Sequence, residues 1–401
     1  MSDLLFTALS KLSMENNGTI MKNFLLLFSM SLIFICVVSI AQPKDVDSLV
    51  INKAGLNVEV VWKYKTNNMV TSSPVYSDGV IYIGAGSSLL AIDTLGKKLF
   101  SFKTQGPVKC RPAVANTKIY FQSGDGWLYC ISKVNGKEIW KIQLDATDYL
   151  QLYDFWDYYH SSPLIINNML YIGSSSTFLY AIESETGRGI WKFKTNHIIR
   201  SSPVYDSGNI YFGSFDGCFY SVNAMSGKEV WRYKMPEANY SRCGEIQSSA
   251  IISDNKVIFG SRDGRVHALN KETGKEIWNY SHDGSWVISS PAIYDSIVIV
   301  GSSDAHFINA MEVKTGKEVW KYFTKFNVFS SPIIANSTVL CGDGNAYNFM
   351  EGASFFALDL YSGKEMWRVK TDGQVWSSPI KVKNRVYFVT YVGTIYAINT
   401  D

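Results

Sequence analysis

The chain has 401 residues, of which 46% are hydrophobic, 14% aromatic and 18% charged. This apolar fraction is that of a globular protein, so disorder of the whole chain is excluded. With 38 Lys and Arg against 35 Asp and Glu, the net charge of +3 lacks the concentrated basic excess of a nucleic-acid-binding protein. The many aromatic residues and the 30 glycines favour a β-rich fold with many tight turns.

Residues 1–41 have the pattern of an N-terminal extension followed by a secretory signal peptide. A short basic start at residues 21–23 precedes an apolar run over residues 24–41, which ends in small residues before Gln42. An uncleaved membrane anchor is the alternative, because the run is about 18 residues long. Both interpretations predict a periplasmic or secreted protein, associated with the membrane if the signal stays uncleaved. Residues 42–59 are then a short linker.

The cysteines beyond the signal peptide lie in a compartment where disulfides can form. They are odd in number, widely spaced and without a C-x-x-C pair, which favours small buried residues over a disulfide framework or a metal site. They are Cys110, Cys130, Cys218, Cys243 and Cys341. We expect no metal-ligating residues elsewhere in the sequence either.

A repeat dominates the rest of the chain. A glycine turn followed by an aromatic residue recurs at spacings of 38 to 51 residues. A second marker, Ser-Ser-Pro or a close variant, keeps step with it, and in the second to fifth copies it precedes the tryptophan by 30 residues. Periods of this size are typical of propellers and solenoids. The aromatic positions are Trp62, Phe100, Trp140, Trp191, Trp231, Trp278, Trp320 and Trp367, and the markers begin at Ser72, Cys110, Ser161, Ser201, Ser248, Ser289, Ser330 and Ser377.

Each copy has the pattern of four short strands. In residues 201–234, alternating apolar residues between Gly-rich turns predict one strand after the marker and three more over 210–213, 218–222 and 229–234. Four-stranded units at this period are the blades of a propeller. We number the blades 1 to 8 in the order of their markers.

The two ends of the repeat region complete each other. Residues 60–65 read as a fourth strand without its first three, and residues 377–399 as three strands without a fourth. A blade built from both ends closes the ring and removes the open sheet edges. The sequence therefore predicts an all-β fold, an eight-bladed β-propeller of four-stranded antiparallel blades over residues 60–401. The tryptophans are structural in this fold, each docking on a turn of the neighbouring blade.

Two of the repeats, LYAIESETGRGIW and VHALNKETGKEIW, carry a resemblance to a known family. Over residues 60–400 the chain resembles the tryptophan-docking repeat of quinoprotein-type (PQQ-like repeat) β-propellers. The resemblance implies one of two functions. One branch of that family consists of dehydrogenases that bind pyrroloquinoline quinone and calcium at the centre of the propeller. The other is non-enzymatic and is typified by the propeller subunit of the outer-membrane β-barrel assembly machinery.

The residues that the dehydrogenase branch uses are not evident in this sequence. In that branch two adjacent cysteines stack on the quinone, and this sequence has no adjacent cysteines. Calcium needs several converging oxygen ligands. The Asp-Gly turns instead recur at equivalent positions of different blades, which is typical of hairpin turns: Asp125, Asp216, Asp263 and Asp343. We find no catalytic motif, so we predict no catalytic residue and no cofactor; quinone and calcium belong to the alternative alone.

A long insertion between Trp140 and Ser161 is the first candidate interaction surface. It interleaves aspartates with aromatic residues, which interface hot spots use. The alternative is that the aromatic residues only pack the loop onto the rim. The candidate contact residues are Tyr153, Phe155, Trp156 and Tyr158.

The residue before each marker is the second candidate, because it lies where an inner strand begins near the axis. Consecutive blades carry a polar or basic group, Lys109, His160, Arg200 and Gln247, and then an apolar group, Ile288, Phe329 and Trp376. Such a funnel mouth is suited to an acidic group on one flank and an apolar chain on the other. The alternative is a solvated rim without a ligand.

These observations predict an exported, non-enzymatic propeller that binds a protein or peptide partner at the cell envelope. An acidic small molecule is a further candidate ligand, nucleic acid is not, and the chain is expected as a monomer within a complex. The alternative function is that of a periplasmic quinone-dependent dehydrogenase.

Overall fold

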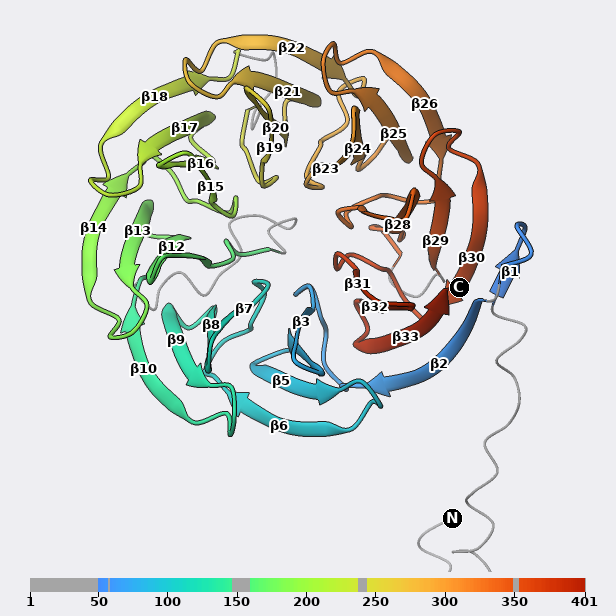
Figure 1. Ribbon diagram of the computed structural model, residues 1–401, viewed down its shortest axis with the longest axis horizontal. Coiled ribbons are helices and arrows are strands. Elements are labelled where there is room, and N and C mark those ends of the chain that lie inside the picture. Colours follow the sequence, from blue (N-terminus) through green and yellow to red (C-terminus); the bar gives the residue numbers. More distant parts are fainter. Residues whose placement is uncertain (1–49, 57, 146–158, 237–243, 349–352, 401) are drawn as a thin grey trace, which may run out of the picture. The chain divides into compact units, whose positions relative to one another are not determined.

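The computed structural model describes residues 50–56, 58–145, 159–236, 244–348 and 353–400. Regular structure in these ranges consists of strands, which form eight sheets around a common axis (Figure 1). The predicted eight-bladed propeller is therefore confirmed. None of the described segments forms a helix long and apolar enough to cross a membrane. The predicted signal peptide lies outside the described residues.

The first four blades follow one another along the chain. Blade 1 contains β3 (Val75–Ser77), β4 (Val80–Gly84), β5 (Ser88–Asp93) and β6 (Lys98–Lys103). Blade 2 contains β7 (Ala113–Ala115), β8 (Lys118–Gln122), β9 (Trp127–Ser132) and β10 (Glu138–Gln143). Blade 3 contains β11 (Leu164–Ile166), β12 (Met169–Gly173), β13 (Phe178–Glu183) and β14 (Gly189–Lys194). Blade 4 contains β15 (Val204–Asp206), β16 (Asn209–Gly213), β17 (Cys218–Asn223) and β18 (Glu229–Lys234).

The other four blades complete the ring. Blade 5 contains β19 (Ile251–Ser253), β20 (Lys256–Ser261), β21 (Arg265–Asn270) and β22 (Glu276–Ser281). Blade 6 contains β23 (Ala292–Tyr294), β24 (Ile297–Gly301), β25 (Phe307–Glu312) and β26 (Glu318–Phe323). Blade 7 contains β27 (Ile333–Ala335), β28 (Thr338–Gly342), β29 (Ala353–Asp359), β30 (Glu365–Thr371) and β1 (Val50–Asn52). Blade 8 contains β31 (Ile380–Val382), β32 (Arg385–Val389), β33 (Thr394–Thr400) and β2 (Val58–Lys65).

Within a blade, the first strand lies nearest to the axis and the fourth at the rim (Figure 1). The second and third strands are almost entirely buried, because neighbouring blades cover both of their faces. The fourth strand alternates exposed and half-buried residues, as expected for a strand with one solvated face. The apolar core therefore lies between the blades rather than at the axis.

The ring closes through the two ends of the repeat region, as the sequence predicts. Strand β2 pairs antiparallel with β33, with Lys63 opposite Tyr396 and Val60 opposite Ile398. The strand begins at Val58, two residues before the predicted start. In Figure 1 these strands lie side by side at the rim. Closure gives β33 a partner along its outer side and completes blade 8 as a four-stranded sheet.

Strand β1 lies within residues 42–59, the range predicted to be a linker. It pairs antiparallel with the outer strand β30 of blade 7, with Val50 opposite Val369. The Nζ of Lys53 lies 2.9 Å from a carboxylate oxygen of Glu365 on the same strand. Blade 7 therefore has five strands, and part of the predicted linker belongs to the propeller.

The rim tryptophans dock on the next blade in a repeated geometry. The Nε1 of Trp278 donates a hydrogen bond to the carbonyl oxygen of Val313, at 3.0 Å, and its ring covers Gly316. A Cβ at Gly316 would come within 2.6 Å of that ring, and the residue has a φ of +71°, so glycine suits both the contact and the turn. Equivalent Nε1–carbonyl hydrogen bonds are made by Trp62, Trp140, Trp191, Trp231 and Trp320.

Blade 7 departs from this geometry, because the third and fourth strands of blade 8 come from opposite chain ends and no turn joins them. Trp367 therefore has no glycine turn to cover. It is 1% exposed and lies in a core cluster that also includes Val50 and Leu56 of the N-terminal segment. The segment around β1 takes the place of the missing turn.

Candidate functional site

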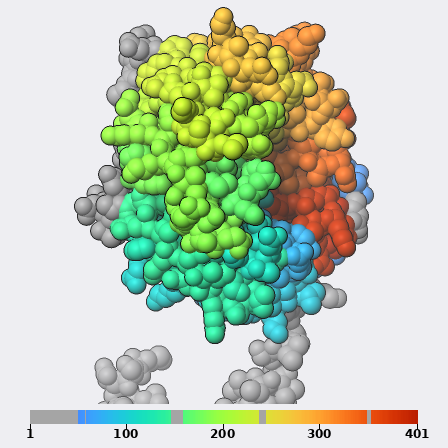
Figure 2. Space-filling model, turned by 60° about the vertical axis from the view of Figure 1, so that its left-hand side comes forward, coloured from blue at the N-terminus to red at the C-terminus, as the bar shows by residue number. Residues whose placement is uncertain are grey.

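A cavity of about 500 Å³ lies where the inner strands of all eight blades begin. In the space-filling view the ring is hollowed between the green blades and the orange and red ones (Figure 2). This volume is within the range of small-molecule sites. We call it the axial cavity. Its wall consists of the marker residues and of the residues that precede them, so the repeat itself brings these side chains together.

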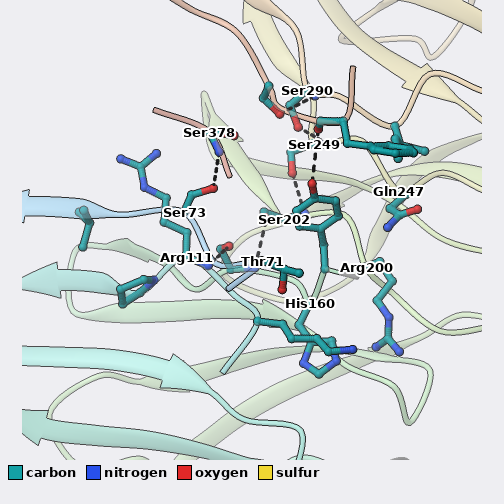
Figure 3. Close-up of a pocket in the computed structure, with 18 of the residues that line it drawn as sticks. Thr71, Ser73, Arg111, His160, Arg200, Ser202, Gln247, Ser249, Ser290 and Ser378 are labelled. Carbon is teal, nitrogen blue, oxygen red and sulfur yellow. Dashed lines mark hydrogen bonds between the residues drawn. The ribbon is translucent and has the colours of Figure 1, made fainter. Parts of the chain in front are cut away.

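Serines from seven blades form part of this wall, and Figure 3 shows some of them. At six of the eight blade junctions, the Oγ of the second marker serine accepts a hydrogen bond from the backbone N–H of the corresponding residue in the preceding blade. Distances of 2.8 to 3.0 Å join Arg111 to Ser162, Ser162 to Ser202, Ser202 to Ser249, Ser249 to Ser290, Ser290 to Ser331 and Ser378 to Ser73. The marker serines thus connect neighbouring blades at the axis. The repeat pattern did not predict this role.

Arg111 is the one residue at the second marker position that is not serine. Its side chain extends away from those of His160 and Arg200 (Figure 3). Surrounding protein desolvates the guanidinium and lowers the pKa of Arg111, although the side chain is still reached by solvent. It makes no ion pair within the described residues. The repeat carried a signal for this residue, namely Arg in place of the second marker serine.

The basic flank of the predicted funnel lines the axial cavity as a group. Lys109 and His160 are half-buried, whereas Arg200 and Gln247 are 4% and 5% exposed. A guanidinium nitrogen of Arg200 donates a hydrogen bond to the Oγ of Ser175, at 2.6 Å. These side chains therefore belong to the inner wall and are not a solvated rim.

The apolar flank is arranged differently. Ile288, Phe329 and Trp376 pack together in one cluster, and the Tyr159 hydroxyl donates a hydrogen bond to the Trp376 carbonyl oxygen at 2.8 Å. Trp376 is 1% exposed and does not line the cavity, in contrast to the predicted position at the funnel mouth. Since Tyr159 covers this cluster from the axis, the apolar surface available to a ligand is smaller than the sequence predicts.

Tyr159 was missed because its role depends on a neighbouring blade. At the corresponding position the other blades have Val or Ile, and in six of them this residue fills the space beside a glycine at the end of the preceding second strand, as Ile199 does beside Gly173. In blade 2 that strand ends in Gln122, which is buried and donates a hydrogen bond to the Ser161 carbonyl oxygen. The Gln122 side chain takes up the space, so the residue at position 159 turns toward the axis.

The Asp-Gly carboxylates lie on separate blades, and three of the four accept hydrogen bonds within their turns, as predicted; Asp343 instead accepts from the Ser354 N–H, at 2.7 Å and 11 residues away. The Oδ1 of Asp216 accepts a hydrogen bond from the Cys218 N–H at 2.9 Å, and Asp125 and Asp263 accept equivalent bonds within their own turns. The predicted contact residues of the long insertion, Tyr153, Phe155, Trp156 and Tyr158, lie outside the described residues.

The described wall of the axial cavity does not fit a calcium ion. It contains Lys109, Arg111, His160 and Arg200 but no aspartate or glutamate, and calcium is bound mainly through carboxylate and carbonyl oxygens. Within the described ranges no cluster of three or more His, Cys, Asp and Glu residues is placed to hold a metal. The described wall is lined by basic side chains instead.

The described cysteines are buried and free. Burial raises the pKa of Cys110 and of Cys341 to about 12, so both stay thiols at neutral pH. They are structural residues, as predicted, and Cys243 lies outside the described residues.

Comparison with solved structures places this propeller among several of its kind. BamB from Moraxella catarrhalis matches with a TM-score of 0.69 at 14% identity, over 85% of this chain and 97% of that one. A europium-containing methanol dehydrogenase matches with a TM-score of 0.71 at 13% identity, over 87% of this chain and 94% of that one. At these identities the likeness concerns the fold alone.

Comparison of sequences separates the two branches only in part. The quinohemoprotein alcohol dehydrogenase ADH IIB of Pseudomonas putida is 28% identical over 173 residues, which is 38% of this chain and 24% of that relative. A family model described as outer membrane protein assembly factor BamB matches residues 56–155, 159–285, 220–349 and 335–401. Because these matches cover nearly the whole propeller, the chain belongs to the BamB-like family of PQQ-like repeat β-propellers.

Proposed function

We propose that the chain is an exported, non-enzymatic β-propeller that binds a protein partner at the cell envelope and takes part in outer-membrane protein assembly. The observation that carries this proposal is the family match, which extends with short gaps from residue 56 to residue 401. The apolar run at 24–41 supports export.

The construction of the ring also supports a binding role. Serine hydrogen bonds connect neighbouring blades at the axis, tryptophans connect them at the rim, and pairing of β2 with β33 closes the circle. Such a scaffold presents its loops without rearrangement, which lowers the entropic cost of association.

The test is deletion of the gene in its source organism. We expect lower amounts of outer-membrane β-barrel proteins, restored by the full chain but not by a chain without residues 1–41. Co-purification of the full chain with the barrel-assembly complex is the direct companion measurement. Unchanged barrel proteins together with no co-purification would contradict the proposal.

The second candidate function is that of a quinone-dependent dehydrogenase, which the similarity to ADH IIB favours. Calorimetry with pyrroloquinoline quinone and calcium separates the two functions. We expect no stoichiometric binding, because the described cavity wall has no carboxylate for calcium and the sequence has no adjacent cysteines. Micromolar 1:1 binding accompanied by dye-linked alcohol oxidation would replace the scaffold proposal with the enzyme.

A further inference from the structure

The outer strand of blade 7 already pairs with an added strand. β1 lies antiparallel on β30, with its three residues opposite Trp367, Arg368 and Val369. The backbone N–H groups of Lys53 and Ala54 continue the contact by donating hydrogen bonds to a carbonyl oxygen of the same strand, at 2.8 and 3.0 Å. The rim edge of a blade in this propeller therefore accepts an extended segment (Figure 1).

In blade 6, β26 is the outermost strand of its sheet within the described residues. An open strand edge presents unpaired N–H and C=O groups, and proteins commonly protect it with charged side chains, especially lysine. This propeller has such a protecting residue at a fixed position. The third residue after the docking aromatic residue is exposed in all eight blades, and it is lysine in five of them: Lys65, Lys103, Lys194, Lys234 and Lys370.

Blade 6 has Phe323 at this position instead of lysine. The Phe323 side chain is 71% exposed, and Val319 on the same strand is 45% exposed. Lys321, the one lysine of β26, is folded onto the sheet, with its Nζ 4.5 Å from the ring centroid of Phe307 and 3.2 Å from a carboxylate oxygen of Glu318. The edge of β26 therefore exposes apolar side chains and lacks the protecting lysine.

Packing within the blade does not account for Phe323. It lies opposite Phe307 on β25, and the two ring centroids are 6.2 Å apart. In blade 3 the corresponding pair is Phe178 and Lys194. An aromatic residue on the third strand therefore does not require a second one at the rim. The exposed ring of Phe323 is an apolar surface that gains free energy when a partner covers it.

We infer that the edge of β26 binds an extended segment of a partner protein, which adds to blade 6 as a fifth antiparallel strand and packs an apolar side chain against Phe323. The register follows from that of β1 on β30. Three residues of the segment lie opposite Trp320, Lys321 and Tyr322, and the next lies opposite Phe323. Main-chain hydrogen bonds supply affinity in this mode of binding, and the contact with Phe323 supplies specificity.

This inference goes beyond the proposed function, because it specifies the surface that holds a partner and does not depend on the role of that partner in assembly.

The test is selection of peptides from a random library displayed on phage, with the full chain as the immobilised target. We expect enriched peptides to carry apolar residues at alternate positions, because successive side chains of a strand point to opposite faces. Their affinity, measured by fluorescence anisotropy, should fall at least about tenfold in Phe323→Lys, which restores the residue of most other blades. Failure to enrich any peptide, or equal affinity for this variant, overturns the inference.

Two further variants separate the loss of the ring from the added charge. Phe323→Ser introduces the residue that blade 5 has at this position, Ser281, and should also weaken binding. Gln143→Lys on the rim strand β10 is the matched control, because it adds the same charge at the corresponding exposed position of blade 2 and should leave the affinity unchanged. Thermal unfolding of each variant establishes that it is folded.

N-methylated peptides distinguish strand pairing from a contact with the ring alone. Alternate N–H groups of a strand point toward the same neighbour. Of two peptides that are methylated at alternate positions, one on each set of N–H groups, only one should therefore lose binding. Equal affinities of the two methylated peptides would overturn the pairing with β26.

Sedimentation velocity of the wild type examines a second copy of the chain as the occupant of this edge. We expect a monomer. A dimer that dissociates in Phe323→Lys would assign the edge to self-association and overturn the inference. Peptide binding and self-association alone decide this inference, so it can fail while the assembly role holds, and the reverse.

Discussion

The rim and the axis of this propeller are built from the same repeat but have diverged to different degrees. At the rim, a tryptophan donates to a carbonyl of the next blade at six blade junctions, with almost the same geometry. At the axis, the residue before each marker differs from blade to blade. The rim contacts at these six junctions share one geometry, so a substitution on one side of a junction leaves the residue on the other side without its partner. The residues before the markers make different contacts in different blades, such as Arg200 with Ser175 and Gln247 with Arg262, so this position can differ and carry specificity.

Trp278→Ala should destabilise the propeller more than the other substitutions described below. We expect a loss of roughly 3–5 kcal/mol in the free energy of unfolding, as for other large aromatic residues removed from a core. Trp278 is 8% exposed, whereas the adjacent Ile277 is 42% exposed on the same strand. Ile277→Ala is therefore the control, with an expected change within about 0.5 kcal/mol. Equal losses in chemical denaturation would show that the docking contact is not the source of stability.

Gly316→Ala should have the next largest effect, about 2 kcal/mol, because both a positive φ and a contact with Trp278 oppose a Cβ. Gly208→Ala separates the two causes. Gly208 has a φ of +86° but nothing within 4 Å of its Cβ position, so only the backbone strain of about 1 kcal/mol remains. If Gly208→Ala lowers the free energy of unfolding as much as Gly316→Ala does, the contact with Trp278 does not contribute to the effect.

Blades 4 and 5 have different residues at one buried position, Tyr220 and His267, and the histidine makes stability depend on pH. In blade 4 the Tyr220 hydroxyl donates to Asp216 at 2.7 Å. In blade 5 the equivalent His267 lies between Asp263 at 2.9 Å and Glu276 at 2.8 Å. Burial alone would lower the pKa of His267, but the hydrogen bonds to the two carboxylates outweigh it and raise this pKa above its usual range. The hydrogen bond with His267 in turn lowers the pKa of Glu276 to about 2, so that carboxylate is charged at neutral pH.

A histidine with a raised pKa stabilises the fold fully below its ordinary pKa of about 6.5. That contribution is lost as the pH rises through the raised value. Between mildly acidic and alkaline pH, the wild type should therefore lose on the order of 1 kcal/mol of its free energy of unfolding. His267→Tyr, which introduces the residue that blade 4 has at this position, should not show this loss. Unfolding free energies of the wild type and the variant across this range are the measurement. Parallel pH profiles would show that His267 is neutral throughout.

Arg111→Ser should have the smallest effect on stability, within about 0.5 kcal/mol, because the other seven blades carry serine at this position. The new hydroxyl is placed to accept from the Ser73 N–H and so to extend the serine ring. A large loss of melting temperature would show that Arg111 supports the ring itself.

The repeat was sufficient to predict the blade number, the strands and the closure. Strands were predicted to within about two residues because alternation and Gly-rich turns are local signals. Strand β1 was not predicted, since three residues have no detectable period and their partner Val369 is more than 300 residues away. Of the predicted funnel residues, Lys109, His160, Arg200, Gln247 and Phe329 line the cavity, because position relative to the marker determines distance from the axis.

The sequence by itself determined the architecture, because a repeated pattern of short strands has one way of burying its apolar faces, in a closed ring. Only the tertiary structure decided which side chains face the cavity. Trp376 turned into the core and Tyr159 toward the axis, according to the space left by residues of other blades, such as Gln122. The orientation of the Gln247 amide depends in the same way on a hydrogen bond from Arg262, which is 15 residues further along the chain. Such contacts depend on shape and packing between strands, which no local pattern of residues encodes.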